Sequence, residues 1–211
     1  MTANETLIQT LPKGMYPLME QFYTLQGEGA YTGNAAYFIR LGGCDVGCVW
    51  CDVKESWDAR QHTLVNAREI VSVASTYNSR LAVITGGEPA MFSLVALADA
   101  LHEEGFRVHI ETSGAYTLQG DLDWVTISPK KFKPALDETL LLANELKVVI
   151  YHKTDLAWAE QFVSRVPAQC KLYLQPEWSK KEEMTPMLTK YIMKHPQWQL
   201  SLQTHKYIHI P

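Results

Sequence analysis

The 211-residue sequence lacks features that mark several broad classes of protein. No apolar stretch reaches the roughly 20 residues that a helix needs to cross a membrane. A basic excess is also missing, because 19 Lys and Arg residues face 23 Asp and Glu residues, for a net charge of −4. Nucleic-acid-binding domains usually show the opposite balance. We therefore expect no membrane span and no nucleic-acid partner.

A secretory signal is missing as well. Residues 1–11 contain an acidic residue but neither a basic residue nor a long apolar run, and a signal peptide needs both. Residues 1–17 are polar and interrupted by two prolines and a glycine, which predicts a loose N-terminal leader. The apolar content of 46% is enough for one sizeable core. We therefore expect a single domain over residues 18–211.

Cysteine is scarce and unevenly placed. Cys44, Cys48 and Cys51 fall within eight residues, at spacing C-x3-C-x2-C, directly after two glycines. This clustering does not resemble a disulfide framework and instead predicts metal ligation in a reducing compartment, so we expect a cytoplasmic protein. Cys170 is isolated on a predicted strand, where a buried thiol is the simpler interpretation.

Three thiolates in one short loop make a soft-metal site that is one ligand short. Structural zinc and ordinary iron–sulfur cubanes take four protein ligands. We interpret the loop as holding a [4Fe-4S] cluster with one iron open to a small molecule. Gly86-Gly87-Glu88-Pro89 follows a nearby strand and suits an amino-acid ammonium group, with Glu88 as its expected contact. A non-catalytic zinc or iron module, with Cys170 as fourth ligand, is the alternative.

Short apolar strands alternate with helical segments along the chain, which predicts an α/β fold with a parallel sheet. We expect six or seven strands in an open sheet that forms a partial barrel. Asn66 and Ser93 are expected to cap the first two helices. The predicted strands include 19–25, 35–41, 81–85, 106–111, 123–127, 145–150 and 170–174, and further helices are expected near 135–143, 154–166 and 181–195.

Polar residues gather where the predicted strands end. In parallel α/β folds that edge binds ligands, so these residues and the cysteine loop are expected to face one cavity. Arg40 interrupts an apolar strand and needs a partner, either a structural salt bridge or an anionic ligand. Strand 19–25 runs into a loop that presents Glu28 between two glycines. The remaining strand-end residues are Thr85, Glu111, Ser128, Lys130 and Gln175.

The cysteine motif, with Trp50 before its last cysteine and Gly-Gly-Glu-Pro further along, resembles the radical S-adenosylmethionine superfamily. Motifs in order along nearly the whole chain resemble the 7-carboxy-7-deazaguanine synthase family. They lie at 22–29, 85–89, 110–114, 128–130, 144–149 and 201–207. An activase that makes a glycyl radical on a partner protein shares the cysteine spacing and is the other enzymatic alternative, although the motif-rich tail argues against it.

The resemblance implies a partial (β/α)6 barrel whose cluster cleaves S-adenosylmethionine to a 5′-deoxyadenosyl radical. The family converts 6-carboxy-5,6,7,8-tetrahydropterin to 7-carboxy-7-deazaguanine with loss of ammonia, on the way to queuosine. The resemblance also implies a homodimer and a flavodoxin- or ferredoxin-type reductant. No catalytic acid–base residue is expected, because the radical carries the chemistry.

The resemblance assigns roles residue by residue. The substrate is expected to contact Leu25, Gln26, Gly27, Arg40, Thr85 and the C-terminal carboxylate of Pro211, and we add Glu28 from its place in the glycine loop. S-adenosylmethionine is expected to contact Gly87, Ser128, Pro129, Lys130, Gln175, Pro176, Glu177 and Trp178. We add Glu88, whose carboxylate suits the ammonium group of the methionine part.

One position departs from the family pattern. The family uses Mg2+ and has Thr or Ser two residues after the last cysteine, where this chain has Val53, following Asp52. Valine offers no oxygen, and Mg2+ takes oxygen ligands. Either substrate and water hold the ion, or Asp52 replaces the hydroxyl, or the enzyme depends on Mg2+ weakly. Our hypothesis is weak dependence.

Overall fold

The computed structural model describes residues 4, 8 and 10–211. Its centre is one nine-stranded sheet in the order β3-β1-β2-β4-β5-β6-β7-β8-β9. The strands are β1 (Met15–Leu25), β2 (Ala35–Leu41), β3 (Thr63–Asn66), β4 (Leu81–Gly86), β5 (Arg107–Thr112), β6 (Trp124–Ile127), β7 (Glu145–Ile150), β8 (Lys171–Pro176) and β9 (Trp198–Leu200).

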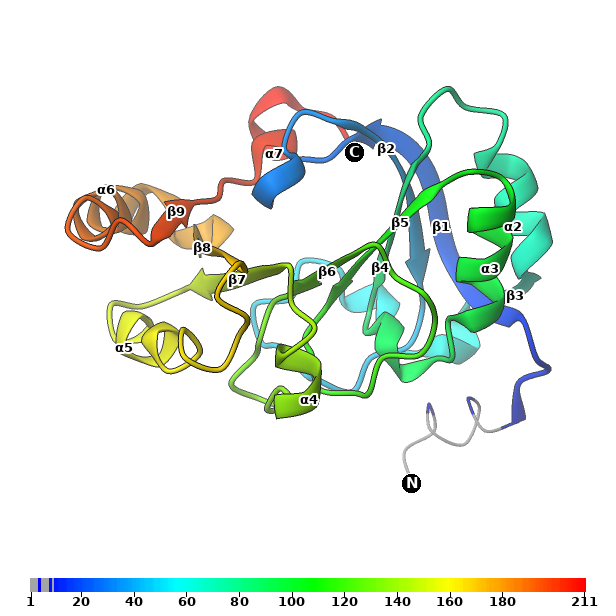
Figure 1. The fold of residues 1–211 in the computed structure, drawn as a ribbon, viewed down its shortest axis with the longest axis horizontal. Helices are drawn as coiled ribbons and strands as arrows, with labels where there is room; N and C mark the ends of the chain where they lie inside the picture. The colour runs from blue at the N-terminus through cyan, green and yellow to red at the C-terminus, as the bar shows by residue number, and fades with distance from the viewer. Residues whose placement is uncertain (1–3, 5–7, 9) are drawn as a thin grey trace.

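Strands β2 and β4 to β9 run parallel, while β1 pairs antiparallel with both β2 and β3. Most parallel connections carry a helix on the outer side of the curved sheet, and the C-terminal helix lies beside the turn between β1 and β2 (Figure 1). The predicted open, mostly parallel α/β sheet is therefore confirmed. The helices are α2 (Ala67–Ala74), α3 (Val95–Glu103), α4 (Asp137–Leu140), α5 (Asp155–Glu160), α6 (Lys181–Ile192) and α7 (Thr204–Ile208).

Side chains alternate across each parallel strand, because successive residues point to opposite faces of a sheet. On β7, Leu146 and Val148 are fully buried in the apolar core, whereas Lys147 lies on the concave face and lines a cavity. On the outer face, Leu97 and Leu101 of α3 are fully buried in the same core. Burying each such side chain contributes about 1.5–3 kcal/mol. The outer face thus stabilises the sheet, and the concave face is left for polar chemistry.

The N-terminal part of the sheet is larger than the sequence predicts. Strand β1 begins at Met15 because Met15 to Leu18 pair with β3, an edge strand that the sequence analysis did not anticipate. Of the predicted leader 1–17, residues 1–3, 5–7 and 9 lie outside the described residues, and Met15–Pro17 belong to β1.

Helix boundaries differ from the predictions at several points. Asn66 caps α2 as expected, accepting from the Arg68 amide. Ser93 does not cap α3, because the cap position is Leu94, which makes no capping side-chain bond. Helix α4 is a single turn. After α5 the chain changes to i−3 hydrogen bonds, from Gln161 to Trp158 among others, so the predicted long helix ends at Glu160.

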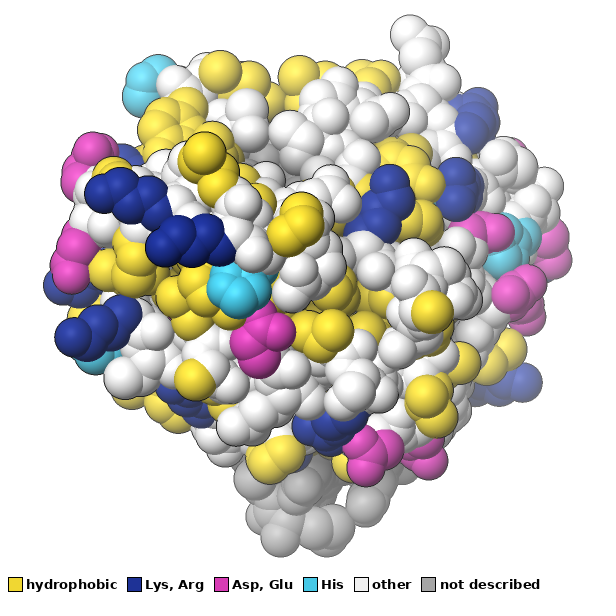
Figure 2. Space-filling model, turned by 60° about the vertical axis from the view of Figure 1, so that its left-hand side comes forward, with side chains coloured by type: hydrophobic (Ala, Val, Ile, Leu, Met, Phe, Trp, Pro, Cys, Tyr) yellow, Lys and Arg dark blue, Asp and Glu magenta, His cyan; other side chains and the backbone are white. Residues whose placement is uncertain are grey.

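The face shown in Figure 2 carries no broad field of one charge. Among the described residues, no helix is long and apolar enough to cross a membrane. On the face shown in Figure 2, basic, acidic and apolar side chains are interspersed. This mixture accords with the small net charge of the chain.

Candidate active site

A cavity of about 370 Å³ lies at the C-terminal edge of the parallel strands. The three loop cysteines line it together with the strand ends and the C-terminal tail. Of the predicted site residues, Pro129 alone does not line this cavity. Those that do are Leu25, Gln26, Gly27, Glu28, Arg40, Cys44, Cys48, Cys51, Asp52, Val53, Thr85, Gly87, Glu88, Ser128, Lys130, Gln175, Pro176, Glu177, Trp178 and Pro211.

Backbone contacts fix the start of the cysteine loop. The Cys44 amide donates to Trp57 O at 3.0 Å, and the Glu88 amide donates to Gly43 O at 2.8 Å. Glycine is needed at position 87, since a Cβ there would stand 2.4 Å from Gly43 O. The loop therefore packs directly against the Gly-Gly-Glu-Pro turn without using its thiols.

The thiols suit a soft-metal centre. All cysteines are free, and burial raises the pKa of Cys44 to about 11, so a thiolate there requires a nearby cation. Within the described part of the chain, no three His, Cys, Asp or Glu side chains already converge to hold a metal ion. The loop thus provides three thiols facing one cavity, and a cluster would have to draw them together.

Cys170 takes no part in this centre. It precedes β8 and so lies at the opposite end of that strand from Gln175, which lines the cavity. Its side chain is buried in the apolar core, and burial raises its pKa to about 12. The interpretation as a buried thiol is confirmed, and Cys170 cannot serve as a fourth ligand.

Glu88 is buried and heavily hydrogen-bonded. Its Oε1 accepts from the Thr112 hydroxyl at 2.5 Å and from the Ala90 amide at 3.0 Å, while Oε2 accepts from the Ser113 amide at 2.8 Å and from the Ser113 hydroxyl. A carboxylate has about four acceptor positions, and all are used. Glu88 therefore ties the glycine turn to the end of β5, and an amine would have to share one of these oxygens.

Residues on the β6 and β8 side form a second polar group. Lys130 Nζ donates to Ser128 O at 2.5 Å and to Ser128 Oγ at 2.6 Å. Burial lowers the pKa of Lys130. Gln175 Oε1 accepts from the Ser201 hydroxyl at 2.7 Å, and Trp178 packs edge-on against Tyr207 at 5.2 Å. This wall offers amides, a cation and an aromatic ring to a ligand.

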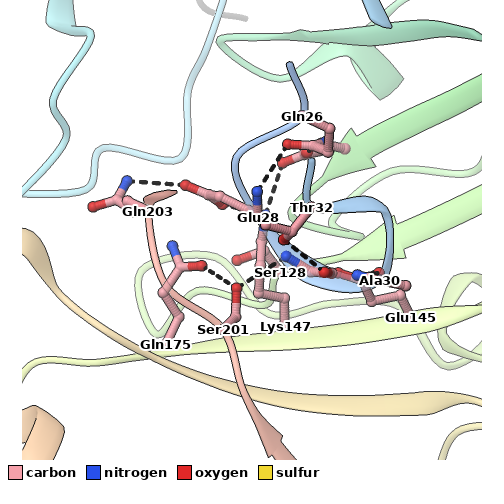
Figure 3. Close-up of polar contacts among 12 residues, drawn as sticks. Gln26, Glu28, Ala30, Thr32, Ser128, Glu145, Lys147, Gln175, Ser201 and Gln203 are labelled. Carbon is pink, nitrogen blue, oxygen red and sulfur yellow. Dashed lines mark hydrogen bonds and ion pairs between the residues drawn. The ribbon is translucent and has the colours of Figure 1, made fainter. Parts of the chain in front are cut away.

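Lys147 lies between two carboxylates, those of Glu28 and Glu111, on the concave face. Figure 3 shows Lys147 and Glu28. Lys147 Nζ donates to Glu28 and, at 2.9 Å, to Glu111 Oε2. Burial alone would raise the pKa of Glu28, but the charge and hydrogen bond of Lys147 outweigh burial and lower it to about 2. Burial likewise lowers the pKa of Lys147, and the surrounding carboxylates reverse this and raise it. Glu28 and Lys147 are therefore both charged at neutral pH.

A further carboxylate lies beneath this group. Glu145 is 3% exposed and accepts from the Ala30 amide at 3.0 Å. A Cβ on Gly29 would stand 1.9 Å from its Oε1. Burial raises the pKa of Glu145 to about 7. Glu145 thus holds the loop after Glu28 through the Ala30 amide, and it does not line the cavity.

Arg40 makes the first of its two predicted contacts, the structural salt bridge. Its Nε donates to Glu20 Oε1 at 2.6 Å across the β1–β2 pair, which is the structural salt bridge. Arg40 also lines the cavity, and among the described residues its terminal NH2 groups make no hydrogen bond that competes with a ligand. A carboxylate in the cavity would therefore find a planar pair of donors.

The C-terminal tail closes one side of the cavity. The Thr204 amide donates to Gly27 O at 2.9 Å, and Lys206 Nζ pairs with Asp52 Oδ2 at 2.7 Å. Thr24 Oγ1 donates to Pro211 O at 3.3 Å. A Cβ on Gly27 would collide with the His205 ring at 2.1 Å. The tail therefore joins the loop after β1 to the end of the cysteine loop.

The position after the cysteines offers few ligands to Mg2+. Val53 lines the cavity with an apolar side chain, and Asp52 Oδ2 is paired with the Lys206 ammonium. Mg2+ is usually bound by one or two carboxylates together with waters and substrate oxygens. Val53 therefore supplies no side-chain oxygen, and an ion at Asp52 would compete with Lys206.

The structure also brings in residues that have no role among the sequence-based predictions. Lys147, Gln203 and His205 line the cavity, together with Glu111, which was expected at this edge of the sheet. One available signal was alternation: charged residues two apart, such as Glu145 and Lys147 in an apolar strand, indicate a polar concave face.

Comparison with known proteins gives a consistent result. A model of the radical SAM superfamily matches residues 38–143. The chain is 54% identical over 197 residues to a 7-carboxy-7-deazaguanine synthase of Flavobacterium psychrophilum, covering 93% of each protein. It is 49% identical over 193 residues to the Synechocystis protein of that name, covering 92% of each. The crystal structure of QueE from Escherichia coli is similar with a TM-score of 0.82 and 32% identity, covering 97% of this chain and 100% of that one.

Proposed function

Because the chain belongs to the 7-carboxy-7-deazaguanine synthase family of radical SAM enzymes, we propose that it converts 6-carboxy-5,6,7,8-tetrahydropterin to 7-carboxy-7-deazaguanine and ammonia. The family serves the biosynthesis of queuosine precursors. The resemblance of the motifs and the size of the cavity support the ring contraction itself. A cavity of about 370 Å³ lies in the usual size range for small-molecule sites.

The observation that carries the proposal is that two sets of groups share one cavity. Cys44, Cys48 and Cys51 line it, and the loop Leu25–Gly27 and Pro211 at the end of the tail line it as well. A radical generated at the cysteine loop would therefore form beside the substrate. Holding one C–H bond next to one radical and keeping water out is the main task of such a site.

The three loop cysteines would hold the [4Fe-4S] cluster that the family implies. When bound, this cluster supplies the electron that cleaves S-adenosylmethionine. The remaining contacts to S-adenosylmethionine would come from Gly87, Glu88, Ser128, Pro129, Lys130, Gln175, Pro176, Glu177 and Trp178. Their location on neighbouring strand ends supports this assignment.

The substrate would lie beside this group, against Leu25, Gln26, Gly27, Glu28, Arg40, Thr85 and Pro211. Arg40 is suited to the substrate carboxylate because it lines the cavity and, among the described residues, only the Nε of its side chain is used in a hydrogen bond. The tail carboxylate is suited to N–H donors on the ring. Together these contacts fix the orientation of the ring.

The partners are part of the same proposal. Cleavage of S-adenosylmethionine needs an external electron, and we expect a flavodoxin- or ferredoxin-type reductant. We also expect a homodimer, as in the family. The free cysteines fit a reducing compartment such as the cytoplasm.

The dependence on Mg2+ should be weak, because Val53 has no side-chain oxygen and the Lys206 ammonium competes with the ion for Asp52. Chelator treatment is expected to reduce turnover only partly, and Val53→Thr should increase the stimulation by added Mg2+. Complete loss of activity in chelator, restored fully by micromolar Mg2+, would contradict this hypothesis.

The proposed function is tested with anaerobically reconstituted protein, S-adenosylmethionine, a reductant and the carboxytetrahydropterin. We expect equal amounts of the deazaguanine product and ammonia. Four irons per chain without any product would leave the metal centre intact and reject the proposed substrate.

A further inference from the structure

Lys147 has more partners than a structural ion pair needs. Its side chain is 4% exposed, and its ammonium contacts both Glu28 and Glu111. An ammonium has three N–H groups, and two are used by these carboxylates. All three residues line the cavity beside the proposed substrate loop. The third N–H is therefore available to a ligand.

Amide side chains hold the two carboxylates in place. Glu111 Oε1 accepts from Gln26 Nε2 at 2.9 Å, and Glu28 Oε1 accepts from Gln203 Nε2 at 2.9 Å. Figure 3 shows Glu28 between Gln203 and the loop that begins at Gln26. Such a network is preorganised, so its charges need little rearrangement during a reaction.

We propose that Glu111 and Lys147 form the acid–base pair that releases ammonia, an inference that rests on the proposed function. Glu111 takes a proton from a carbon of the ring-contracted substrate, and the electrons of that C–H bond form a C=C bond. The adjacent C–N bond breaks towards nitrogen, which receives a proton from the Lys147 ammonium and leaves as ammonia.

The pair returns to its starting state without another reactant. After the elimination, Glu111 is a neutral acid and Lys147 a neutral amine. The proton passes from Glu111 to Lys147 across their 2.9 Å contact. Protonating Glu111 also removes one of the negative charges that raise the pKa of Lys147, so the ammonium becomes a stronger acid when it has to donate.

Glu145 supplies a matched control. It lies two residues from Lys147 on the same strand and is also buried, but it does not line the cavity. Glu145→Gln makes the same carboxylate-to-amide change as Glu111→Gln and keeps an oxygen for the Ala30 amide. It is expected to release ammonia at the wild-type rate.

Two variants separate proton transfer from charge. Lys147→Arg keeps a cation between the carboxylates, but a guanidinium does not give up its proton in proteins. Glu111→Gln keeps the acceptor for Gln26 and removes the base. Both variants are expected to keep the wild-type substrate dissociation constant, measured with S-adenosylmethionine and without reductant. In single turnover they should release ammonia about 10²–10⁴-fold more slowly, the usual range for general acid–base catalysis.

An amine-retaining isomer of the substrate should accumulate in both variants. Ammonia release at the wild-type rate in Lys147→Arg would overturn the role of Lys147, and loss of substrate binding in both variants would show a binding role instead. If Lys147→Arg does not fold, the test is the comparison of ammonia-release rates between Glu111→Gln and Glu145→Gln. A wild type that forms no product rejects the proposed function, whereas a working wild type with equally active variants rejects only the pair.

Discussion

Two walls line the cavity, the cysteine loop and the concave face of the sheet around Lys147. The cysteine loop is contiguous in sequence, and backbone hydrogen bonds such as that from Cys44 to Trp57 O hold it. The wall around Lys147 draws side chains from two strands and from the segments after β1 and β9, and these side chains bond to one another.

This difference has a physical meaning. A wall held through its backbone leaves its thiols free for an added group. A wall held through its side chains is already complete and presents fixed charges to a substrate. We therefore expect single changes in the loop to abolish the metal centre, and single changes in the other wall to alter later steps while the centre stays intact.

The largest effect is expected from removing a loop cysteine. Cys44→Ala, Cys48→Ala and Cys51→Ala should each lose the cluster and all turnover, because two thiolates cannot replace three. Cys170→Ala is the matched control, and it should retain full iron content and activity. Iron analysis and visible absorption after anaerobic reconstitution measure both. An iron-free Cys170→Ala protein that still folds would contradict the division between the walls.

Gly87→Ala should act next most strongly. The new Cβ would collide with a backbone oxygen, that of Gly43, and overpacking of this kind costs about 1–3 kcal/mol. If this cost appears in ligand binding, the affinity for S-adenosylmethionine should fall by up to about 100-fold. Gly42→Ala is the control, because its Cβ would meet only the movable ring of His62. Equal spectral titrations of the two variants with S-adenosylmethionine would refute the explanation.

A C-terminal extension tests the opposite wall. Residues added after Pro211 remove its carboxylate, and a hydrogen bond to a charged group is worth about 1.5–3 kcal/mol. Loss of one such hydrogen bond should lower the substrate affinity by about tenfold or more. The cluster spectrum should stay unchanged. An N-terminal tag of the same sequence is the control. Unchanged kinetics in the C-terminally extended protein would rule out a substrate contact at Pro211.

The smallest effect on turnover is expected for Glu145→Gln, which should instead change how stability depends on pH. The pKa of Glu145 is raised to about 7 in the folded protein from 4.5. As pH rises from about 4.5 to about 7, the unfolded chain loses this proton first, so the folded wild type loses stability. The variant lacks this titrating group, so its thermal midpoint should rise relative to that of the wild type between pH 5 and pH 8. If the midpoint of the variant falls relative to that of the wild type over this range, the pKa of Glu145 is not raised.

The cysteine loop could be predicted from sequence because its ligands are neighbours in the chain. The strand ends around it followed from the rule that ligands bind at one edge of a parallel sheet. The edge strand β3 was missed because two of its four residues are polar and its pairing with Met15 to Leu18 is distant in sequence. The Ser93 cap failed because α3 begins one residue later than a cap at Ser93 requires.

The wall around Lys147 could not be assembled from sequence. Its contacts depend on the register between strands, which sets Glu111 level with Glu145 across β6. The long Lys147 side chain, two residues further along β7, then reaches both Glu111 and Glu28. The partners of Glu88 likewise come from the end of β5. Such distances between strands are set by the folded sheet, whereas residue types and spacing only indicated that the concave face is polar.

The central claim is that both walls act on one substrate, and a crystal structure of the reconstituted protein with S-adenosylmethionine and the carboxytetrahydropterin tests it most directly. We predict that the substrate lies between the loop Leu25–Gly27 and Lys147. Its carboxylate-bearing carbon should lie about 3–3.5 Å from the 5′ carbon of S-adenosylmethionine, the separation of a reactive arrangement. A substrate bound outside this cavity, or held on the far side of it from the cysteine loop, would contradict the account.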